Sequence, residues 1–231
     1  MSKQAIIFDV DGTLVDTNAA HVVAWEHAFR LFGYEVSQEA IHGQIGKGGD
    51  KLVPALLGEA VEKRDGEALR RAHGEAFVAI ARKVRFRIFS GVHALFAELR
   101  RRGLRIAAAT SSKQDHLDAT LRSSGLELKE LVDEVVTKSE AGESKPAPDL
   151  VEAAVEKLGL SPGACVMVGD TPYDVEAASK AGVRCVGLLC GGIFGIEELY
   201  VSGAAAVFRD PEDLHRRLDE ALREREGAHV H

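Results

Sequence analysis

The sequence predicts an α/β fold, a doubly wound, Rossmann-like parallel sheet with an all-helical cap inserted after its first strand. Ala5 to Phe8 form an unbroken apolar run that ends in an acid-rich turn, which is typical of a strand buried on both faces. From about Phe89 onwards, apolar runs of strand length alternate with amphipathic segments, which indicates a parallel sheet covered by helices on both faces. Residues from about 16 to 88 show helical patterns alone. We therefore expect a core of residues 1–15 and 89–231 and a cap of residues 16–88.

Each element follows from a local pattern. In the cap, apolar side chains recur every three or four residues from Thr17 to about Phe32, and Gly33 ends this helix. Further cap helices are expected over 37–42, 51–57 and 59–83, separated by the segment GQIGKGGD and by Gly58. Core strands are expected over 5–8, 104–110, 133–138, 164–170, 183–189 and, at the sheet edge, 204–208. Core helices are expected over 92–102, 113–124, 148–158, 172–181 and 211–225.

The composition argues against several classes of protein. Lys and Arg number 29 and Asp and Glu number 36, and the resulting net charge of −7 argues against a nucleic-acid-binding surface. The three cysteines are odd in number and unclustered, so neither a disulfide framework nor a zinc site is indicated. There is no charged-then-apolar leader and no apolar stretch of about 18 residues, so we expect no membrane partner and a cytoplasmic location. The sequence leaves open whether the protein is a monomer or a dimer. We expect the tail GAHVH to be disordered rather than to bind metal.

Two carboxylates follow the first predicted strand. Asp9 and Asp11 are two residues apart, so both side chains leave an extended chain on the same side, and Gly12 allows a sharp turn after them. Two carboxylates about 4 Å apart repel by roughly 4 kcal/mol at an effective dielectric of about 20, unless a cation or a shared proton intervenes. A turn cap is the simpler interpretation of Asp-x-Asp-Gly. Otherwise the pair indicates a metal or covalent chemistry, at the sheet edge where open α/β sheets bind ligands.

Hydroxyl side chains follow a second predicted strand. Thr110, Ser111 and Ser112 come after the apolar run LRIAAA and precede a helix expected to begin at Lys113. They form either an anion cradle at the helix N-terminus or a simple helix cap.

A third strand end is acidic. Asp170 ends the strand over 164–170 and can share one hard cation with Asp9 through oxygen ligands. Asp174 follows the expected N-cap Thr171 and Pro172 at the first helical position, so capping alone is a serious alternative for Asp174.

Lys145 stands between these strand ends, in the segment ESKPAPD. A lysine in a loop is usually solvated. Here Pro146 and Pro148 stiffen the segment, and a fixed ammonium can bridge a phosphate and the carboxylates.

Taken together, these motifs resemble those of the haloacid dehalogenase-like superfamily, specifically its phosphatase branch. The matching segments are DVDGT at 9–13, Thr110 after an apolar strand, Lys145 in KPAPD, and GDTPYD at 169–174. Their order and their places at strand ends are specific to that superfamily. A helical cap between the first and second motifs resembles the phosphoglycolate phosphatase and β-phosphoglucomutase subgroup.

The resemblance implies a Mg²⁺-dependent phosphatase of small phosphorylated metabolites. Asp9 would attack phosphorus and form an aspartyl-phosphate, and Asp11 would protonate the leaving oxygen and then take a proton from the attacking water. The phosphoryl oxygens would be held by Thr110, the Ser111 amide and Lys145. The Mg²⁺ ligands would come from Asp9, the backbone carbonyl of Asp11, Asp170 and Asp174.

The resemblance also suggests substrate-binding residues in and near the cap. His21 matches a cap-hinge histidine of the β-phosphoglucomutase type, although a core histidine packed on Trp25 is an equal alternative. Lys47, in the glycine-rich cap loop, and Lys113 are expected to meet a substrate carboxylate or a second phosphate.

A β-phosphoglucomutase-like sugar phosphate mutase is the alternative function. Such mutases generally carry Glu-Asp where this chain has Gly169-Asp170, and an arginine where it has Lys47, so both departures favour hydrolysis. Dehalogenases and phosphonatases of the superfamily lack an acid at the position of Asp11. A receiver-type signalling domain would lack the helical insert.

Overall fold

The computed structural model describes residues 3–223. Their strands form one parallel sheet in the order β3-β2-β1-β4-β5-β6, which confirms the predicted doubly wound fold. The strands are β1 (Ala5–Phe8), β2 (Arg105–Ala109), β3 (Glu134–Val136), β4 (Cys165–Gly169), β5 (Arg184–Leu188) and β6 (Val207–Phe208). The chain crosses from β3 on one side of β1 to β4 on the other. The carboxyl ends of β1 and β4 therefore form the topological switch point at which such sheets bind ligands.

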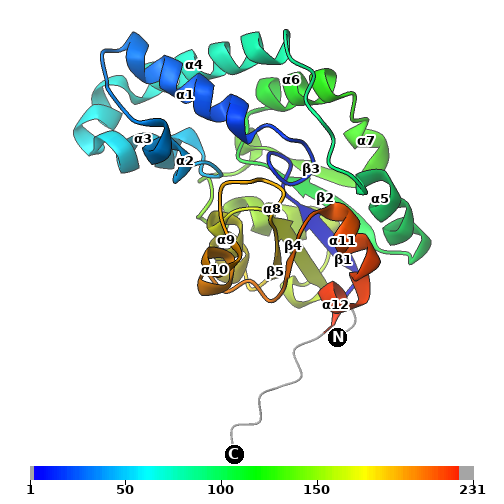
Figure 1. Cartoon of the computed structure of the whole chain (residues 1–231). Coiled ribbons are helices and arrows are strands. Elements are labelled where there is room, and N and C mark those ends of the chain that lie inside the picture. The colour runs from blue at the N-terminus through cyan, green and yellow to red at the C-terminus, as the bar shows by residue number, and fades with distance from the viewer. Residues whose placement is uncertain (1–2, 224–231) are drawn as a thin grey trace, which may run out of the picture.

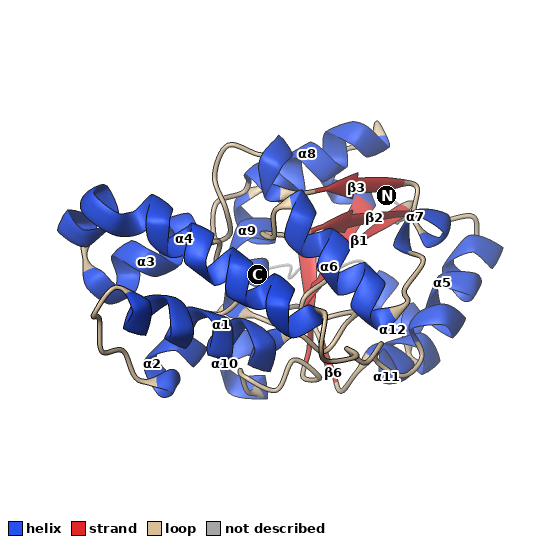
Figure 2. Cartoon of the chain, turned by 90° about the horizontal axis from the view of Figure 1, so that it is seen from above, coloured by secondary structure: helices blue, strands red, loops and turns tan. Residues whose placement is uncertain are grey.

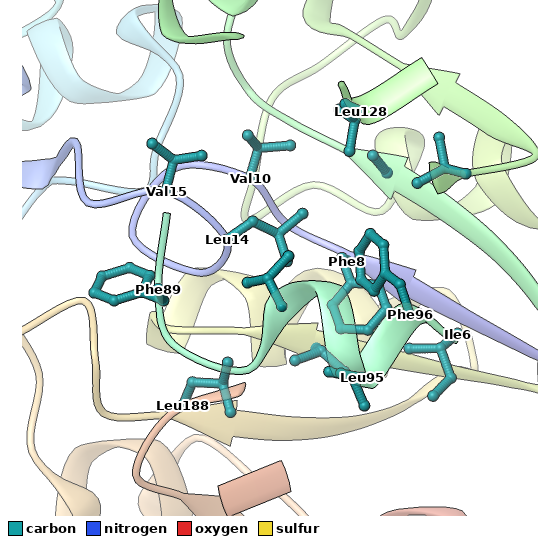
Figure 3. Close-up of a cluster of buried hydrophobic side chains, with 14 of the residues drawn as sticks. Ile6, Phe8, Val10, Leu14, Val15, Phe89, Leu95, Phe96, Leu128 and Leu188 are labelled. Atoms are coloured by element: carbon teal, nitrogen blue, oxygen red, sulfur yellow. The ribbon is translucent and has the colours of Figure 1, made fainter. Parts of the chain in front are cut away.

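The side chains of β1 alternate between two buried layers. Ile6 and Phe8 pack on the face covered by α5 (Val92–Arg101) and α11 (Pro211–Arg216), where the rings of Phe8 and Phe96 lie 4.9 Å apart (Figure 3). Ile7 packs on the opposite face, under α8 (Asp149–Leu158) and α9 (Pro172–Lys180). Figure 2 shows the sheet between its helical layers. Burial on both faces explains why this strand is a continuous apolar run.

Of the five helices between β1 and β2, the first four lie over the carboxyl edge of the sheet (Figure 1). They are α1 (Asn18–Leu31), α2 (Gln38–His42), α3 (Gly49–Leu57) and α4 (Glu59–Ala81). Helices α1 and α3 both pack on α4, and their apolar faces form a cluster of their own around Trp25, Phe29, Leu52 and Leu69. This group of helices is the predicted helical cap.

The chain enters and leaves the cap through two segments that pair with each other. Val15 lies opposite Ile88 in an antiparallel bridge, and the N–H of Asp16 donates to the carbonyl of Arg87 over 2.9 Å. Both pairs lie at the two predicted junctions between cap and core. We propose that the cap spans residues 16–88 and the core residues 1–15 and 89–231, and the paired segments support these boundaries.

The structure departs from the sequence prediction mainly in short elements. The closing helix expected over 211–225 is two helices, α11 and α12 (Leu218–Leu222), because the backbone of Arg217, with φ −115° and ψ 26°, interrupts it. Residues 224 and 225 of that prediction, and the tail 227–231, lie outside the described residues. The edge strand β6 has two residues rather than five. Helices α7 (Leu128–Leu131) and α10 (Ile196–Val201) were not predicted, because segments of four and six residues are too short to show a helical repeat of apolar side chains.

Within residues 3–223, none of the helices has the length and apolar character that a membrane crossing requires. The cysteines at 165, 185 and 190 are free thiols, as expected.

Candidate active site

Polar side chains meet where three neighbouring strands end. Asp9 follows β1, Thr110 follows β2 and Asp170 follows β4, and all three are buried. Asp170 accepts hydrogen bonds from the Thr13 hydroxyl and the Asn18 amide, each over 2.9 Å. The sheet order thus places these residues together at the switch point.

The turn after Asp9 depends on a glycine. Gly12 has a φ of +78°, and a Cβ there would lie 2.3 Å from both Asn18 and Asp170. Only glycine fits this close approach, which brings the first motif against the end of β4.

Lys145 lies among the carboxylates. Its ammonium contacts the carboxylate of Asp9 and lies 2.7 Å from Oδ1 of Asp174, and the residue is 1% exposed. Burial alone would lower the pKa of Lys145, but the Asp174 and Asp9 carboxylates outweigh it and hold that pKa above the usual lysine range. Lys145 is therefore a fixed cation at the ends of the strands.

A third carboxylate, that of Asp170, lies beside the two that contact Lys145. One oxygen of each of Asp9, Asp170 and Asp174 lies within 4.8 Å of the others. Burial raises the pKa of Asp9 well above its usual value, despite the Lys145 ammonium, and the neighbouring acids raise it further. Burial and the Asp174 charge raise the pKa of Asp170 to about 7. When ionised, the three carboxylates would carry more negative charge than Lys145 offsets, and a divalent cation with oxygen ligands fits that charge and spacing.

Asp174 has both of the functions that the sequence left open. Its Oδ2 accepts from the N–H of Thr171 over 3.0 Å and from the Thr171 hydroxyl over 2.7 Å, which closes a capping box on α9 with Pro172 in its first turn. Its Oδ1 faces Lys145. One carboxylate therefore fixes the start of the helix and belongs to the acid cluster.

Asp11 is held by side chains from separate segments. The Thr17 hydroxyl donates to its Oδ1 over 2.8 Å, and the hydroxyls of Ser112 and Thr110 donate to its Oδ2 over 2.8 and 3.2 Å. Nε2 of His21 lies 3.3 Å from Oδ1. Burial would raise the pKa of Asp11, but His21 and the hydroxyl donors outweigh it and hold the pKa well below the usual range. Contacts of this kind argue against a simple turn cap.

The serines after β2 do not cap the helix that follows. Helix α6 (Gln114–Ser124) begins one residue later than expected, with Lys113 as N-cap and no side-chain hydrogen bond at that cap. The Ser112 hydroxyl points to Asp11, and the Ser111 hydroxyl donates to the carbonyl of Gly46 in the cap over 3.4 Å. The helix-cap interpretation of these serines is therefore wrong.

The glycine-rich cap loop, residues 43–50, and the start of α3 contact the core. The Tyr173 hydroxyl donates to the carbonyl of Gly43, and the Lys51 ammonium lies 3.0 Å from the Glu143 carboxylate. Gly46 has a φ of +101°, and a Cβ there would lie 2.7 Å from Thr171. The loop can approach the start of α9 this closely only because residue 46 is glycine.

A cavity of about 190 Å³ lies between the cap and the strand ends. Asp9 and Asp11 line it, together with the cap residues Trp25 and Ile45. Four cationic side chains also line it, namely Lys47, Arg70, Lys113 and Lys138. The ammonium of Lys47 lies 2.6 Å from Oε1 of Gln44 and 4.6 Å from the ring centre of Tyr173. The cavity therefore combines an acidic end with a cationic lining.

Aromatic and histidine rings form one wall of this cavity. His21 stacks on Phe77 of α4, with ring centres 4.0 Å apart, whereas Trp25 stacks on His73 at 4.1 Å. The interpretation of His21 as a histidine packed on Trp25 is therefore wrong. His73 and His116 both line the cavity and were not singled out from the sequence.

Comparison with known proteins agrees with this geometry. Residues 6–188 match the family model described as haloacid dehalogenase-like hydrolase. The chain belongs to this family. It is 30% identical over 192 residues to protein CbbY of Cereibacter sphaeroides, a match that covers 79% of this chain and 83% of that protein. It is 27% identical to the pyrophosphatase PpaX of Oceanobacillus iheyensis, with 80% and 82% covered.

Solved structures show the same fold for this haloacid dehalogenase-like hydrolase. A hydrolase from Pseudomonas syringae is 31% identical with a TM-score of 0.88, and the match covers 96% of this chain and all of that one. CbbY from Rhodobacter sphaeroides in complex with xylulose-(1,5)bisphosphate is 26% identical with a TM-score of 0.74, with 93% and 96% covered. These findings confirm the predicted family, the helical-cap fold and the enzyme class, a hydrolase of the phosphatase type.

Proposed function

We propose that this haloacid dehalogenase-like hydrolase is a Mg²⁺-dependent phosphatase that hydrolyses small phosphorylated metabolites, such as phosphoglycolate or a sugar phosphate, through an aspartyl-phosphate. The observation that carries the proposal is that Asp9 and Asp11 line one small cavity in different surroundings. Asp9 contacts a fixed ammonium within an acid cluster. Asp11 is held outside that cluster by hydroxyls and His21. Such a pair suits a nucleophile beside an acid–base group.

In the first step, a carboxylate oxygen of Asp9 attacks phosphorus and forms a new P–O bond. The bond from phosphorus to the ester oxygen breaks, and Asp11, which must enter this step protonated, gives that oxygen its proton and becomes a carboxylate. Lys145, Thr110 and the Ser111 N–H hold the phosphoryl oxygens as charge develops on them. The buried contact of Lys145 with Asp9 supports this placement, because the same ammonium lies beside the nucleophile and the arriving phosphate.

In the second step, water attacks the aspartyl-phosphate. Asp11, now a carboxylate, takes the proton of this water while the bond between phosphorus and Asp9 breaks. Inorganic phosphate leaves and the Asp9 carboxylate is restored. The hydrogen bonds that stabilise the ionised form of Asp11 support its function as the base in this step.

Mg²⁺ would be held by Asp9, Asp170, Asp174 and the backbone carbonyl of Asp11. The spacing of the three buried acids, and the raised pKa values of Asp9 and Asp170, support the site, because a cation would relieve the cost of ionising them together. When bound, the ion offsets the negative charge of a phosphate placed beside carboxylates.

The cationic lining supports a substrate with a second polar or anionic group. Lys47 and Lys113 are proposed to bind that group, and His21 to contact the substrate near Asp11. The two named relatives and the bisphosphate in the CbbY structure also favour a phosphorylated small molecule. The cytoplasmic location stays a prediction from the sequence. The protein is a monomer or a dimer, and the sequence favours neither.

The test is release of inorganic phosphate from a panel of phosphorylated metabolites, with Mg²⁺ and with excess chelator. Asp9→Asn should abolish release, while Asp219→Asn, an exposed acid on α12, should retain it. Release that persists in Asp9→Asn would overturn the proposed mechanism. Interconversion of sugar phosphates after addition of a bisphosphate, without phosphate release, would instead indicate the mutase.

A further inference from the structure

His73 lies directly behind His21, on the side away from Asp11. Nδ1 of His21 and Nε2 of His73 are 3.3 Å apart, and both residues are buried, at 8% and 6% exposure. On the other side of the ring, Nε2 of His21 lies 3.3 Å from Oδ1 of Asp11. Polar atoms within hydrogen-bond range therefore connect His73 through His21 to Asp11.

The two imidazole rings are fixed by reciprocal stacking between α1 and α4. His21 of α1 stacks on Phe77 of α4, with the planes 6° apart. His73 of α4 stacks on Trp25 of α1, with the planes 13° apart. Stacking fixes the plane of each ring, and the contact between the two nitrogens favours the orientation in which they face each other.

The chemistry of imidazole then limits where the protons lie. Burial, together with the neighbouring His21 and His116, lowers the pKa of His73 well below its usual value, so His73 is neutral. A neutral imidazole has one N–H and one acceptor nitrogen. If neutral His21 placed its proton on Nδ1, the lone pair of its Nε2 would face the Asp11 carboxylate, and two acceptors would repel.

The favourable arrangement has His73 donate from Nε2 to Nδ1 of His21. The proton of His21 is then on Nε2, where it faces Asp11. If His21 is protonated on both nitrogens, His73 accepts at Nε2 instead, and the same N–H still faces Asp11. In both states, His73 leaves His21 with an N–H on the nitrogen that lies 3.3 Å from Oδ1 of Asp11.

We propose that His73 is a positioning residue for the acid–base step: its hydrogen bond with Nδ1 of His21 orients that ring and keeps an N–H on Nε2, and His21 in turn holds Asp11 in place to protonate the leaving oxygen. The inference rests on the proposed phosphatase function. It adds a specific consequence, because an alkoxide leaving group needs a proton whereas p-nitrophenolate does not. A defect in positioning Asp11 should therefore depend on the leaving group.

The experiment compares kcat and KM for the alkyl phosphate that the wild type hydrolyses best and for p-nitrophenyl phosphate. His73→Leu removes the ring nitrogen, and His73→Gln restores an amide that can donate or accept near its position. His27→Gln, on the exposed face of α1, is the matched control. Thermal melting of each variant checks that it folds.

We expect His73→Leu to lower kcat for the alkyl phosphate roughly tenfold or more, with little change in KM, because acid–base groups contribute at least that much. The loss on p-nitrophenyl phosphate should be less than about threefold, since that step needs little help from the acid. His73→Gln should recover most of the loss, and His27→Gln should match the wild type.

Equal losses on both esters would show that His73 only packs the cap, and no loss on either would show that it has no effect on Asp11. Both results overturn the inference and leave the proposed function intact, because the wild type remains active. If the wild type hydrolyses neither ester, the proposed function fails, and the inference fails with it.

A second measurement does not depend on activity. Nitrogen-15 histidine NMR, at a pH above the usual histidine range, should show the proton of His21 on Nε2 in the wild type and in His73→Gln. His73→Leu should shift His21 toward a mixture of tautomers. An unchanged His21 tautomer in His73→Leu would overturn the inference.

Discussion

Replacing Asp170 with asparagine should stabilise the metal-free protein and reduce its stabilisation by Mg²⁺. Asp170 is 2% exposed, and burial and the Asp174 charge raise its pKa to about 7. An asparagine can keep both hydrogen bonds of this carboxylate. Its Oδ1 can accept from the Asn18 amide, and its own amide can donate to the Thr13 hydroxyl, which is able to accept. The substitution therefore removes a charge with little loss of hydrogen bonding.

The magnitude follows from the pKa of Asp170. In the unfolded chain an aspartate titrates near 3.9, so between about pH 4 and pH 7 the folded protein binds this proton more tightly than the unfolded chain does. Stability falls with rising pH over such a range, and the full loss is reached above about pH 7. About three pKa units correspond to roughly 4 kcal/mol. Because the neighbouring acids share the same charge, we expect about 2–4 kcal/mol, or roughly 5–15 °C in Tm.

The assay is thermal unfolding of wild type and Asp170→Asn with chelator, at about pH 5 and about pH 8. The variant should melt well above the wild type at the higher pH, and the gap should shrink at the lower pH. Mg²⁺ at 100 times its Kd should raise the free energy of unfolding of the wild type by about 2.7 kcal/mol, and that of the variant by less. Asp219→Asn, which removes an exposed charge, should change little. A chelated variant that melts no higher than the wild type at the higher pH would refute the reasoning.

Three further substitutions test other parts of the site. Lys145→Met should abolish phosphate release and, with chelator, lower the free energy of unfolding in urea by about 3–5 kcal/mol, because it leaves buried carboxylates unpaired. Lys47→Ala should raise KM more than it lowers kcat, as expected for loss of uniform binding, and an unchanged KM across a panel of anionic substrates would contradict this. Gly46→Ala should displace the cap loop from Thr171 and raise KM. Gly33→Ala, at a similar positive φ but with open space around it, separates that displacement from backbone strain.

The fold and much of the site could be predicted because their signals are local. Strands β1, β2 and β4 are largely buried apolar runs long enough to be recognised, and a polar residue follows each of them directly. A parallel sheet gathers the carboxyl ends of its strands at one edge. The positions of Asp9, Thr110 and Asp170 therefore needed no knowledge of packing. Lys145 comes from a loop, and only its place among ordered motifs distinguished it from a solvated lysine.

The cap side of the cavity could not be predicted in the same way. The spacing of His21 and Trp25 places both on one face of α1, as expected, but each ring takes its stacking partner from α4. Which residues of α4 face the cavity depends on how that helix packs on α1, and its 23 residues contain no motif that marks His73 or Arg70. A histidine within a long helix gives no local sequence signal of its contacts with the side chains of another helix.

Asp9 and Asp11 depend on different parts of the molecule, although they are two residues apart. Asp9 contacts Lys145 and the acid cluster, all of which belong to the core. Asp11 accepts from Ser112 of the core and from Thr17, while His21 of α1 lies beside it. Its orientation therefore requires the start of the cap and the loop after β2 to be in place together.

This difference separates the two halves of the proposed reaction. Displacement of the cap should disturb proton transfer by Asp11 before it disturbs attack by Asp9. We therefore expect Gly46→Ala to lose more turnover with alkyl phosphates than with p-nitrophenyl phosphate, as expected for His73→Leu, although the three atoms nearest to a Cβ at position 46 all belong to Thr171. The comparison is made from kcat at saturating substrate. Equal loss on both esters would mean that the cap affects the nucleophile and the acid alike.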